Sequence, residues 1–175
     1  MKAKLIPITL IAWMVPVLAK AEVVSSGQQG FQIKITQTVP VAAEMAYQQF
    51  LRVNEWWHRD HTWFGDAQAL SISPQVGGCF CEINGEQQAL HMTVTYVEPN
   101  KELRMTGGLG PLQMLGVHGG MSWSFKPLSD VATEISLHYQ VTGYTESGLD
   151  KLANIVEQVQ ALQFKRLVNK LTPGE

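Results

Sequence analysis

Hydrophobic and polar residues alternate along much of the chain, and the first clear alternation runs from Phe31 to Val39. Apolar side chains occupy every second position of this segment except at Gln37. A period of two is typical of a strand with one face against a core and the other in water. The same pattern recurs in later segments, and short turns separate them, as in an antiparallel sheet. The predicted strands are 31–39, 70–73, 77–83, 90–96, 103–105, 121–126 and 134–141.

Three other segments have the 3.6-residue period of helices. We predict a short helix over Ala42–Arg52 and a second through Trp57, capped by Asn54. A helix of about 25 residues is predicted at the C-terminus, with Ser147 as its N-cap. Its inner stripe comprises Leu149, Leu152, Val156, Val159, Gln163, Leu167 and Leu171, of which Gln163 is the polar member.

These elements predict an α+β fold with a curved antiparallel sheet of about six to seven strands. Two short helices follow the first strand, and the sheet wraps around the long C-terminal helix. The helix is amphipathic and one sheet face is apolar, so we expect these two surfaces to pack together. Curvature of the sheet holds its middle away from the helix and leaves a space between them.

A hairpin predicted at Asn84-Gly85 contains the only two cysteines of the chain. With these two residues as the turn, Cys79 and Cys81 face the interior and His91 faces outward. The inner face continues through Leu90, Met92 and Val94, and the outer face also carries Phe80 and Glu82.

The chemistry of Cys79 and Cys81 stays open between a disulfide, two buried inert thiols, metal ligands and a redox pair. A disulfide between residues two apart in a strand needs a local distortion, which we expect as a bulge at Gly77-Gly78. His58 and His61 lack a third ligand at suitable spacing, so we predict a solvated helix end there. We name no catalytic residue, no metal site and no cofactor.

The N-terminus has the features of a secretory signal peptide. Lys2 and Lys4 precede an apolar run that ends before Ala19-Lys20-Ala21, which predicts cleavage before Glu22. We therefore expect 1–21 to be a signal peptide, 22–29 a short extension, 30–171 the domain and 172–175 a tail. The mature protein would be periplasmic or secreted, with no membrane span after cleavage.

Composition supports one globular domain. The chain has 175 residues, 45% hydrophobic and 16% charged, with a net charge of −2. Cleavage would remove three lysines and leave a net charge of −5. This charge excludes nucleic-acid binding driven by bulk positive charge. Nothing in the sequence indicates the oligomeric state.

The order of these elements resembles the SRPBCC/START-like helix-grip superfamily, which includes START domains, the birch-pollen allergen fold and bacterial polyketide cyclases. The resemblance covers residues 30–171 and is closest to exported bacterial SRPBCC domain proteins. It implies this fold and a hydrophobic-ligand cavity, but no particular reaction. The segments that carry it are NEWWHRDHTWFGDAQALSI, VGGCFCEI, GGLGPLQMLGV, TGYTESGLDKLA and VQALQFKRL.

We therefore predict a cavity between sheet and helix that binds a small apolar ligand, with Gly107–Gln113 as a flexible edge or lid over it. An alternative is an enzyme of cyclase or isomerase type, with Tyr139 or His61 as the acid or base. A second alternative is an interaction domain with a filled core. The predicted pocket wall comprises Trp57, Trp63, Cys79, Cys81, Leu90, Met92, Met105, Trp123 and Tyr139.

Overall fold

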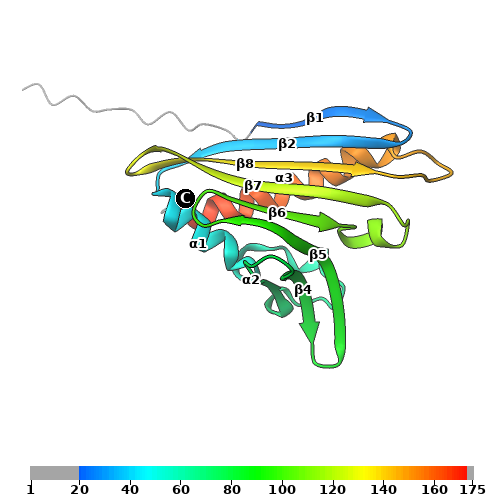
Figure 1. The fold of residues 1–175 in the computed structure, drawn as a ribbon, viewed down its shortest axis with the longest axis horizontal. Coiled ribbons are helices and arrows are strands. Elements are labelled where there is room, and N and C mark those ends of the chain that lie inside the picture. Colours follow the sequence, from blue (N-terminus) through cyan, green and yellow to red (C-terminus); the bar gives the residue numbers. More distant parts are fainter. Residues whose placement is uncertain (1–19, 173–175) are drawn as a thin grey trace, which may run out of the picture.

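Eight strands form one antiparallel sheet in the order β1-β2-β8-β7-β6-β5-β4-β3 (Figure 1). The computed structural model describes residues 20–172, so 1–19 of the predicted signal peptide and 173–175 of the predicted tail lie outside the described residues. The strands are β1 (Lys20–Gly27), β2 (Gly30–Val39), β3 (Leu70–Ile72), β4 (Cys79–Asn84), β5 (Gln87–Glu98), β6 (Glu102–Gly107), β7 (His118–Ser129) and β8 (Ala132–Thr142).

The count exceeds the predicted six to seven strands because β1 pairs with β2 at one edge of the sheet. The sequence of β1, KAEVVSSG, has no alternation of apolar and polar residues. It also spans the predicted cleavage site before Glu22. The pattern that identifies the other strands is therefore missing from this one.

Two short helices, α1 (Ala43–Leu51) and α2 (Val53–Trp56), follow β2, which is the second strand rather than the first. The predicted cap at Asn54 is wrong, since α2 begins one residue earlier. The Asn54 side chain instead donates a hydrogen bond to Gln68 Oε1 at 3.2 Å. Three 3-10 turns complete the connections: η1 (Arg59–His61), η2 (Ala67–Ala69) and η3 (Gly110–Gln113).

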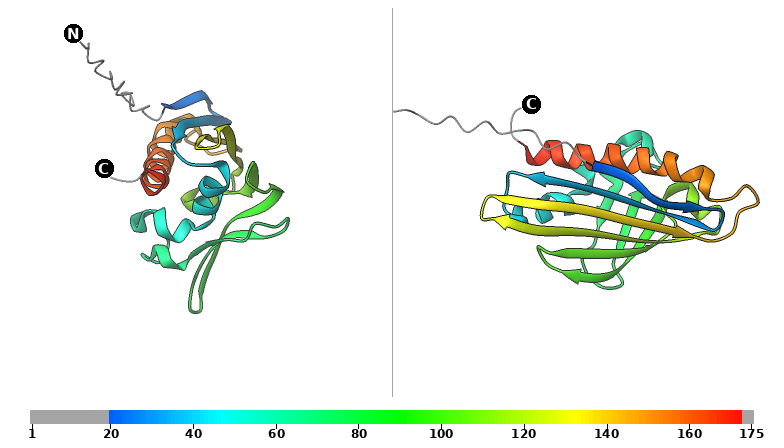
Figure 2. Two further views of the ribbon diagram at one scale, coloured as in Figure 1. Left: turned by 90° about the vertical axis from the view of Figure 1, so that its left-hand side faces the viewer. Right: turned by 90° about the horizontal axis from the view of Figure 1, so that it is seen from above.

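The C-terminal helix α3 (Asp150–Leu171) lies along the concave side of the sheet (Figure 2). The helix begins after Leu149, so the predicted cap at Ser147 is wrong. None of the helices in the described part of the chain has the length and apolarity to cross a bilayer.

Aromatic side chains fill the end of the molecule where α1 and α2 meet the C-terminal half of α3. Trp123 stacks on Phe164 with ring centroids 5.5 Å apart, and Phe50 lies 5.0 Å from Trp123. All three side chains are buried. Burying such rings removes 150–250 Å² of each from water, so this cluster is a main source of stability.

The hairpin between β4 and β5 differs from the prediction by one residue. Asn84 pairs with Gln87, so the two loop residues are Gly85 and Glu86 rather than Asn84 and Gly85. Gly85 has a φ of 63° at the first loop position, as a type II′ turn requires. This shift changes the cross-strand partners, but Cys81 and Leu90 still share one face and Phe80 and Glu82 the other.

A β-bulge at His91 follows this turn. Cys81 pairs with Leu90 and Phe80 pairs with Met92, so His91 is the extra residue of β5. The bulge breaks the alternation, and both His91 and Met92 point inward. Leu90 faces outward and is exposed, contrary to the prediction.

Cys79 and Cys81 therefore lie on the outer face, and the prediction that they face the cavity is wrong. They form a disulfide, one of the four alternatives that the sequence leaves open. Their Cα atoms are 5.4 Å apart, closer than the roughly 6.6 Å between alternate residues of a regular strand. The distortion lies between Phe80 and Cys81, beside the bulge, and not at Gly77-Gly78.

Candidate ligand-binding cavity

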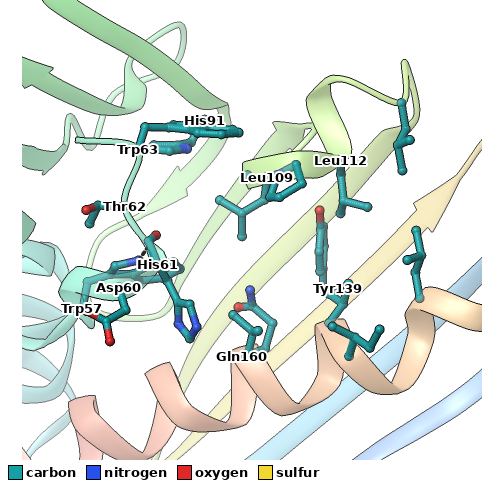
Figure 3. Close-up of a pocket in the computed structure, with 17 residues that line it drawn as sticks. Trp57, Asp60, His61, Thr62, Trp63, His91, Leu109, Leu112, Tyr139 and Gln160 are labelled. Atoms are coloured by element: carbon teal, nitrogen blue, oxygen red, sulfur yellow. Dashed lines mark hydrogen bonds between the residues drawn. The ribbon is translucent and has the colours of Figure 1, made fainter. Parts of the chain in front are cut away.

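A cavity of about 420 Å³ lies between α3, the sheet, the loop around η1 and the loop around η3 (Figure 3). Its volume is within the range of small-molecule sites. Its walls are mostly apolar. They are formed by Trp57, Asp60, His61, Thr62, Trp63, His91, Leu109, Gly110, Pro111, Leu112, Leu115, Tyr139, Leu152, Ile155, Val156, Val159 and Gln160.

The predicted apolar stripe of α3 divides into two parts. Leu167 and Leu171, in the C-terminal half, are buried in the core. Leu152, Val156 and Val159, in the N-terminal half, stay half-buried although they face the sheet. They stay accessible because the cavity lies beneath them. The same helix therefore closes the core at one end and forms a binding wall at the other.

The segment predicted as a lid, Gly107–Gln113, covers one side of the cavity. Leu109 and Leu112 are buried in its wall, and Gly110 has a φ of 56°. This positive φ favours glycine and allows the sharp entry into η3. The Gln113 side chain donates to the Leu90 carbonyl and ties the segment to β5.

The loop around η1 forms the opposite wall and is attached to α3. Trp57 Nε1 donates to the His61 carbonyl at 2.9 Å. Gln163 accepts the His58 N–H at 2.8 Å and donates through Nε2 to His61 Nδ1 at 2.6 Å. Gln163 is fully buried. The polar member of the predicted stripe thus holds this wall in place.

His61 lies at the cavity wall, where the sequence analysis expects a possible acid or base. Burial lowers the pKa of His61, the nearby His58 lowers it further, and Asp60 opposes them. Its Nδ1 is engaged by Gln163, so the role that the structure shows for His61 is to join the loop to α3.

Glu82 is a fully buried carboxylate on the inner face of β4. Its Oε1 accepts the Phe64 N–H at 2.8 Å, and its Oε2 accepts the Trp63 N–H at 2.9 Å. His91 Nε2 lies 3.2 Å from Oε2. A buried carboxylate needs such partners because losing its hydration is costly. The carboxylate therefore fixes both the position of the Trp63 loop and the orientation of the His91 ring.

The His91 tautomer follows from these contacts. The Glu82 carboxylate acts as an acceptor, so the His91 ring contributes an Nε2–H donor. Burial lowers the pKa of His91, which the contact with Glu82 only partly offsets. The neutral ring then presents its Nδ1 lone pair, and Nδ1 is buried without a hydrogen-bond partner among the described residues.

Tyr139 on β8 is fully buried, and its ring borders the cavity. Gly119 of β7 makes room for it, since a Cβ there would lie 2.6 Å from Tyr139 Cε2. Burial raises the pKa of the Tyr139 phenol far above its ordinary value, so the proton stays on. The Leu109 backbone is near the hydroxyl but lacks hydrogen-bond geometry, and Tyr139 Oη has no partner within residues 20–172.

The structure divides the nine predicted wall residues into three groups. Three of them border the cavity, three are buried in the core away from it, and three lie on the outer face of the hairpin. The core group is excluded because the aromatic cluster and neighbouring strands cover it, and the outer group because the Phe80 and Glu82 face of β4 is the buried one. The cavity group comprises Trp57, Trp63 and Tyr139. The core group comprises Met92, Met105 and Trp123. The outer group comprises Cys79, Cys81 and Leu90.

The polar part of the site is absent from the prediction. The sequence pattern correctly groups His91, Phe80 and Glu82 on one face, but the prediction that this face is the outer one is wrong. The turn register alone does not decide which face is buried, and the large apolar side chain of Phe80 was the available signal for the inner face. Gln160 lies outside the predicted apolar stripe of α3, so periodicity gives no signal for it.

A metal site needs at least three ligand side chains close together. Within residues 20–172, no three His, Cys, Asp or Glu side chains come close enough to hold a metal ion. The His58 and His61 rings lie 5.7 Å apart, and His58 Nδ1 accepts the Asp60 N–H. Both histidines therefore have structural contacts in the η1 loop.

Comparison with known proteins gives fold similarity only. No family model matches the chain, and no curated protein matches its sequence. The protein Mll3558 from Rhizobium loti matches with a TM-score of 0.58 and 16% identity, over 81% of this chain and 97% of that one.

Two further solved structures agree with this result. Ms6760 from Mycobacterium smegmatis matches with a TM-score of 0.57 and 12% identity, over 82% of this chain and 92% of that one. EF2215, a conserved protein of unknown function from Enterococcus faecalis, matches with a TM-score of 0.56 and 13% identity, over 89% of this chain and 77% of that one. The α+β sheet-and-helix fold is compatible with a helix-grip fold.

The contacts of Glu82 lead to a stability prediction. Glu82→Gln should lower the free energy of unfolding by about 2 kcal/mol, because an amide NH₂ then meets N–H donors in a buried site. Chemical denaturation measures the change. Glu86→Gln, an exposed change in the same hairpin, is the matched control and should have no effect. Equal stability of the two variants would contradict the role of Glu82.

The lowered pKa of His91 leads to a pH prediction. Between this pKa and the ordinary value of 6.5, the unfolded chain binds a proton more readily than the folded one. Stability should therefore fall as the pH drops from about 7.5 to about 5.5. The drop should be smaller in His91→Gln.

NMR of the imidazole should show a neutral, Nε2-protonated ring at about pH 6.5. A mostly protonated ring at that pH would contradict this assignment.

Proposed function

We propose that this protein binds a small, predominantly apolar molecule in the cavity between the sheet and α3. The observation that carries the proposal is the cavity itself, about 420 Å³ with mostly apolar walls. Water in such a cavity lies against apolar walls, so its replacement by an apolar molecule is favourable. The cavity favours ligand binding over the alternative of a filled core.

Exposed apolar side chains at the cavity wall support the same proposal. Trp63 and Leu115 are each more than two-fifths exposed, and Ile155 is 59% exposed. All three border the cavity and also reach solvent. They offer an apolar path between the surface and the interior, which a ligand of this kind needs in order to enter.

Membership of the SRPBCC/START-like superfamily is part of this proposal. It is supported by the curved sheet, by the long helix on its concave side and by the segments quoted from the sequence. Binding of apolar molecules is what that resemblance implies for the cavity.

Export to the periplasm or the medium is also proposed. The N-terminal pattern supports it, and so does the Cys79–Cys81 disulfide, since disulfides persist in oxidising compartments.

A second candidate function, an enzyme of cyclase or isomerase type, is favoured by the Glu82–His91 pair. A carboxylate that orients an imidazole is a common arrangement for a general base. The Tyr139 phenol borders the same cavity and retains its proton. Binding precedes any such reaction, so ligand binding remains the first proposal.

Filling the cavity tests the binding function. Val156→Phe should weaken the binding of naphthalene about tenfold or more, because the new ring occupies the cavity. Isothermal titration calorimetry measures the affinity. Val131→Phe, the same change at a 70% exposed position in the turn between β7 and β8, should leave it unchanged. If the unaltered protein and both variants bind naphthalene equally, naphthalene binds outside this cavity.

Intact mass of the protein from the exported fraction tests the location. We expect a chain that begins at Glu22 and weighs two hydrogens less than the same chain after reduction. A chain that retains Met1 would contradict export. A mass that does not rise by two hydrogens on reduction would contradict the disulfide.

A further inference from the structure

Three residues that border this one cavity each carry a buried polar atom without a hydrogen-bond partner among the described residues: His91 Nδ1, Tyr139 Oη and Gln160 Oε1. The three residues are 4%, 0% and 2% exposed. Buried polar groups in folded proteins are nearly always hydrogen-bonded, because an unsatisfied group costs stability. Three such atoms around one space indicate that something in that space bonds to them.

The three atoms come from different elements that face the same space. His91 is on β5, Tyr139 is on β8 and Gln160 is on α3 (Figure 3). The sheet and the helix thus each contribute a polar group to a wall that is otherwise mostly apolar. A ligand that meets them must carry polar atoms at its periphery and an apolar body.

The hydrogen-bonding type of each atom is set by its surroundings. His91 Nδ1 is an acceptor, because Glu82 holds the proton of the neutral ring on Nε2. Gln160 Oε1 is an acceptor by its chemistry. The Tyr139 hydroxyl keeps its proton, so it can donate and accept. Two of the three groups therefore require a donor from the ligand.

Gln163 provides a comparison with Gln160, because it is a buried glutamine whose amide is hydrogen-bonded within the protein. It lies one turn along α3 from Gln160 and is equally buried. Both ends of its amide are used, by the His58 N–H and by His61 Nδ1. The fold therefore satisfies a buried glutamine where it serves the structure, and leaves the Gln160 oxygen free where it faces the cavity.

The charges in the cavity wall also indicate the charge of the ligand. No lysine or arginine belongs to the wall as the described residues form it, and its one carboxylate, Asp60, has a 74% exposed side chain. A carboxylate or sulfonate ligand would enter without a counter-ion, which is unfavourable in an apolar cavity. A neutral ligand has no such cost.

We propose that the cavity selects a neutral, mostly apolar compound that carries a hydroxyl group, and that this hydroxyl donates a hydrogen bond to His91 Nδ1. The inference rests on the proposed binding function and specifies its ligand. Trp57, Leu109 and Val156 contact the apolar body of the ligand, and Tyr139 and Gln160 bond to further polar atoms where the ligand has them. Glu82 is a positioning residue that acts through His91.

Four naphthalene probes test the proposal by calorimetry at about pH 7.5, where 2-naphthol is neutral: naphthalene, 2-naphthol, 2-methoxynaphthalene and 2-naphthoate. A purely apolar cavity would bind 2-naphthol no tighter than naphthalene, because the hydroxyl loses its bonds to water. We expect 2-naphthol to bind about tenfold tighter than naphthalene and than 2-methoxynaphthalene, which cannot donate. 2-Naphthoate should bind at least about tenfold more weakly than 2-naphthol.

Variants assign the preference to its atoms. His91→Phe keeps a ring and removes the Nδ1 acceptor together with Nε2, so 2-naphthol should lose about tenfold in affinity while naphthalene is unaffected. Imidazole NMR of the unaltered protein is the second measurement if His91→Phe does not fold, because 2-naphthol should shift the His91 Nδ1 resonance and naphthalene should not. The matched control is His138→Phe, on the opposite face of β8, which should bind both probes as the unaltered protein does.

The outcomes separate this inference from the proposed function. Tighter binding of 2-naphthol that is lost in His91→Phe supports it. Naphthalene binding with no preference for 2-naphthol would overturn the inference and leave the binding function standing. A preference that survives in His91→Phe, or a His91 Nδ1 resonance that 2-naphthol does not shift, would overturn the role of His91. Failure of all four probes to bind would overturn both proposals.

Discussion

The buried carboxylate of Glu82 is the interaction on which the cavity depends. A carboxylate without water must be fully hydrogen-bonded, and here the donors come from two places far apart in the sequence. The backbone at Trp63 and Phe64 supplies two, and the ring of His91 supplies the third. One charge therefore joins the irregular loop around η1 to the edge of the sheet. Gln163 holds the same loop to α3, and Glu82 holds it to the strands.

The helix α3 shows how one amphipathic element can serve two purposes. Its C-terminal half packs on the aromatic cluster around Trp123, and its N-terminal half stands over an open space. The change occurs between Gln163, whose amide joins the loop to the helix, and Gln160, whose oxygen faces the cavity. Packing and binding are thus separated by a single turn of the helix.

The architecture could be predicted from sequence because it follows from periodicity. Strands of period two and a long helix of period 3.6 identify the helix α3 and every strand except β1, which lacks alternation. The site could be predicted only in part: Trp57, Trp63 and Tyr139 border the cavity, whereas His91, Glu82 and Gln160 were not expected there. Alternation groups Glu82 with His91 but does not say which face of β4 meets the core. Gln160 lies beside the predicted apolar stripe of α3, so its position has no counterpart in the pattern of apolar residues.

The bulge in β5 means that His91 stands outside the alternation of the sheet. Because Leu90 pairs with Cys81 and Met92 with Phe80, removing His91 would restore a regular ladder with every neighbouring side chain still on its present face. His91, a polar residue of the cavity wall, is thus a one-residue insertion into a sheet whose strand pairing does not need it. In evolutionary terms, such a site can be acquired or discarded by a single codon, while the strands and the core that support it keep their sequence.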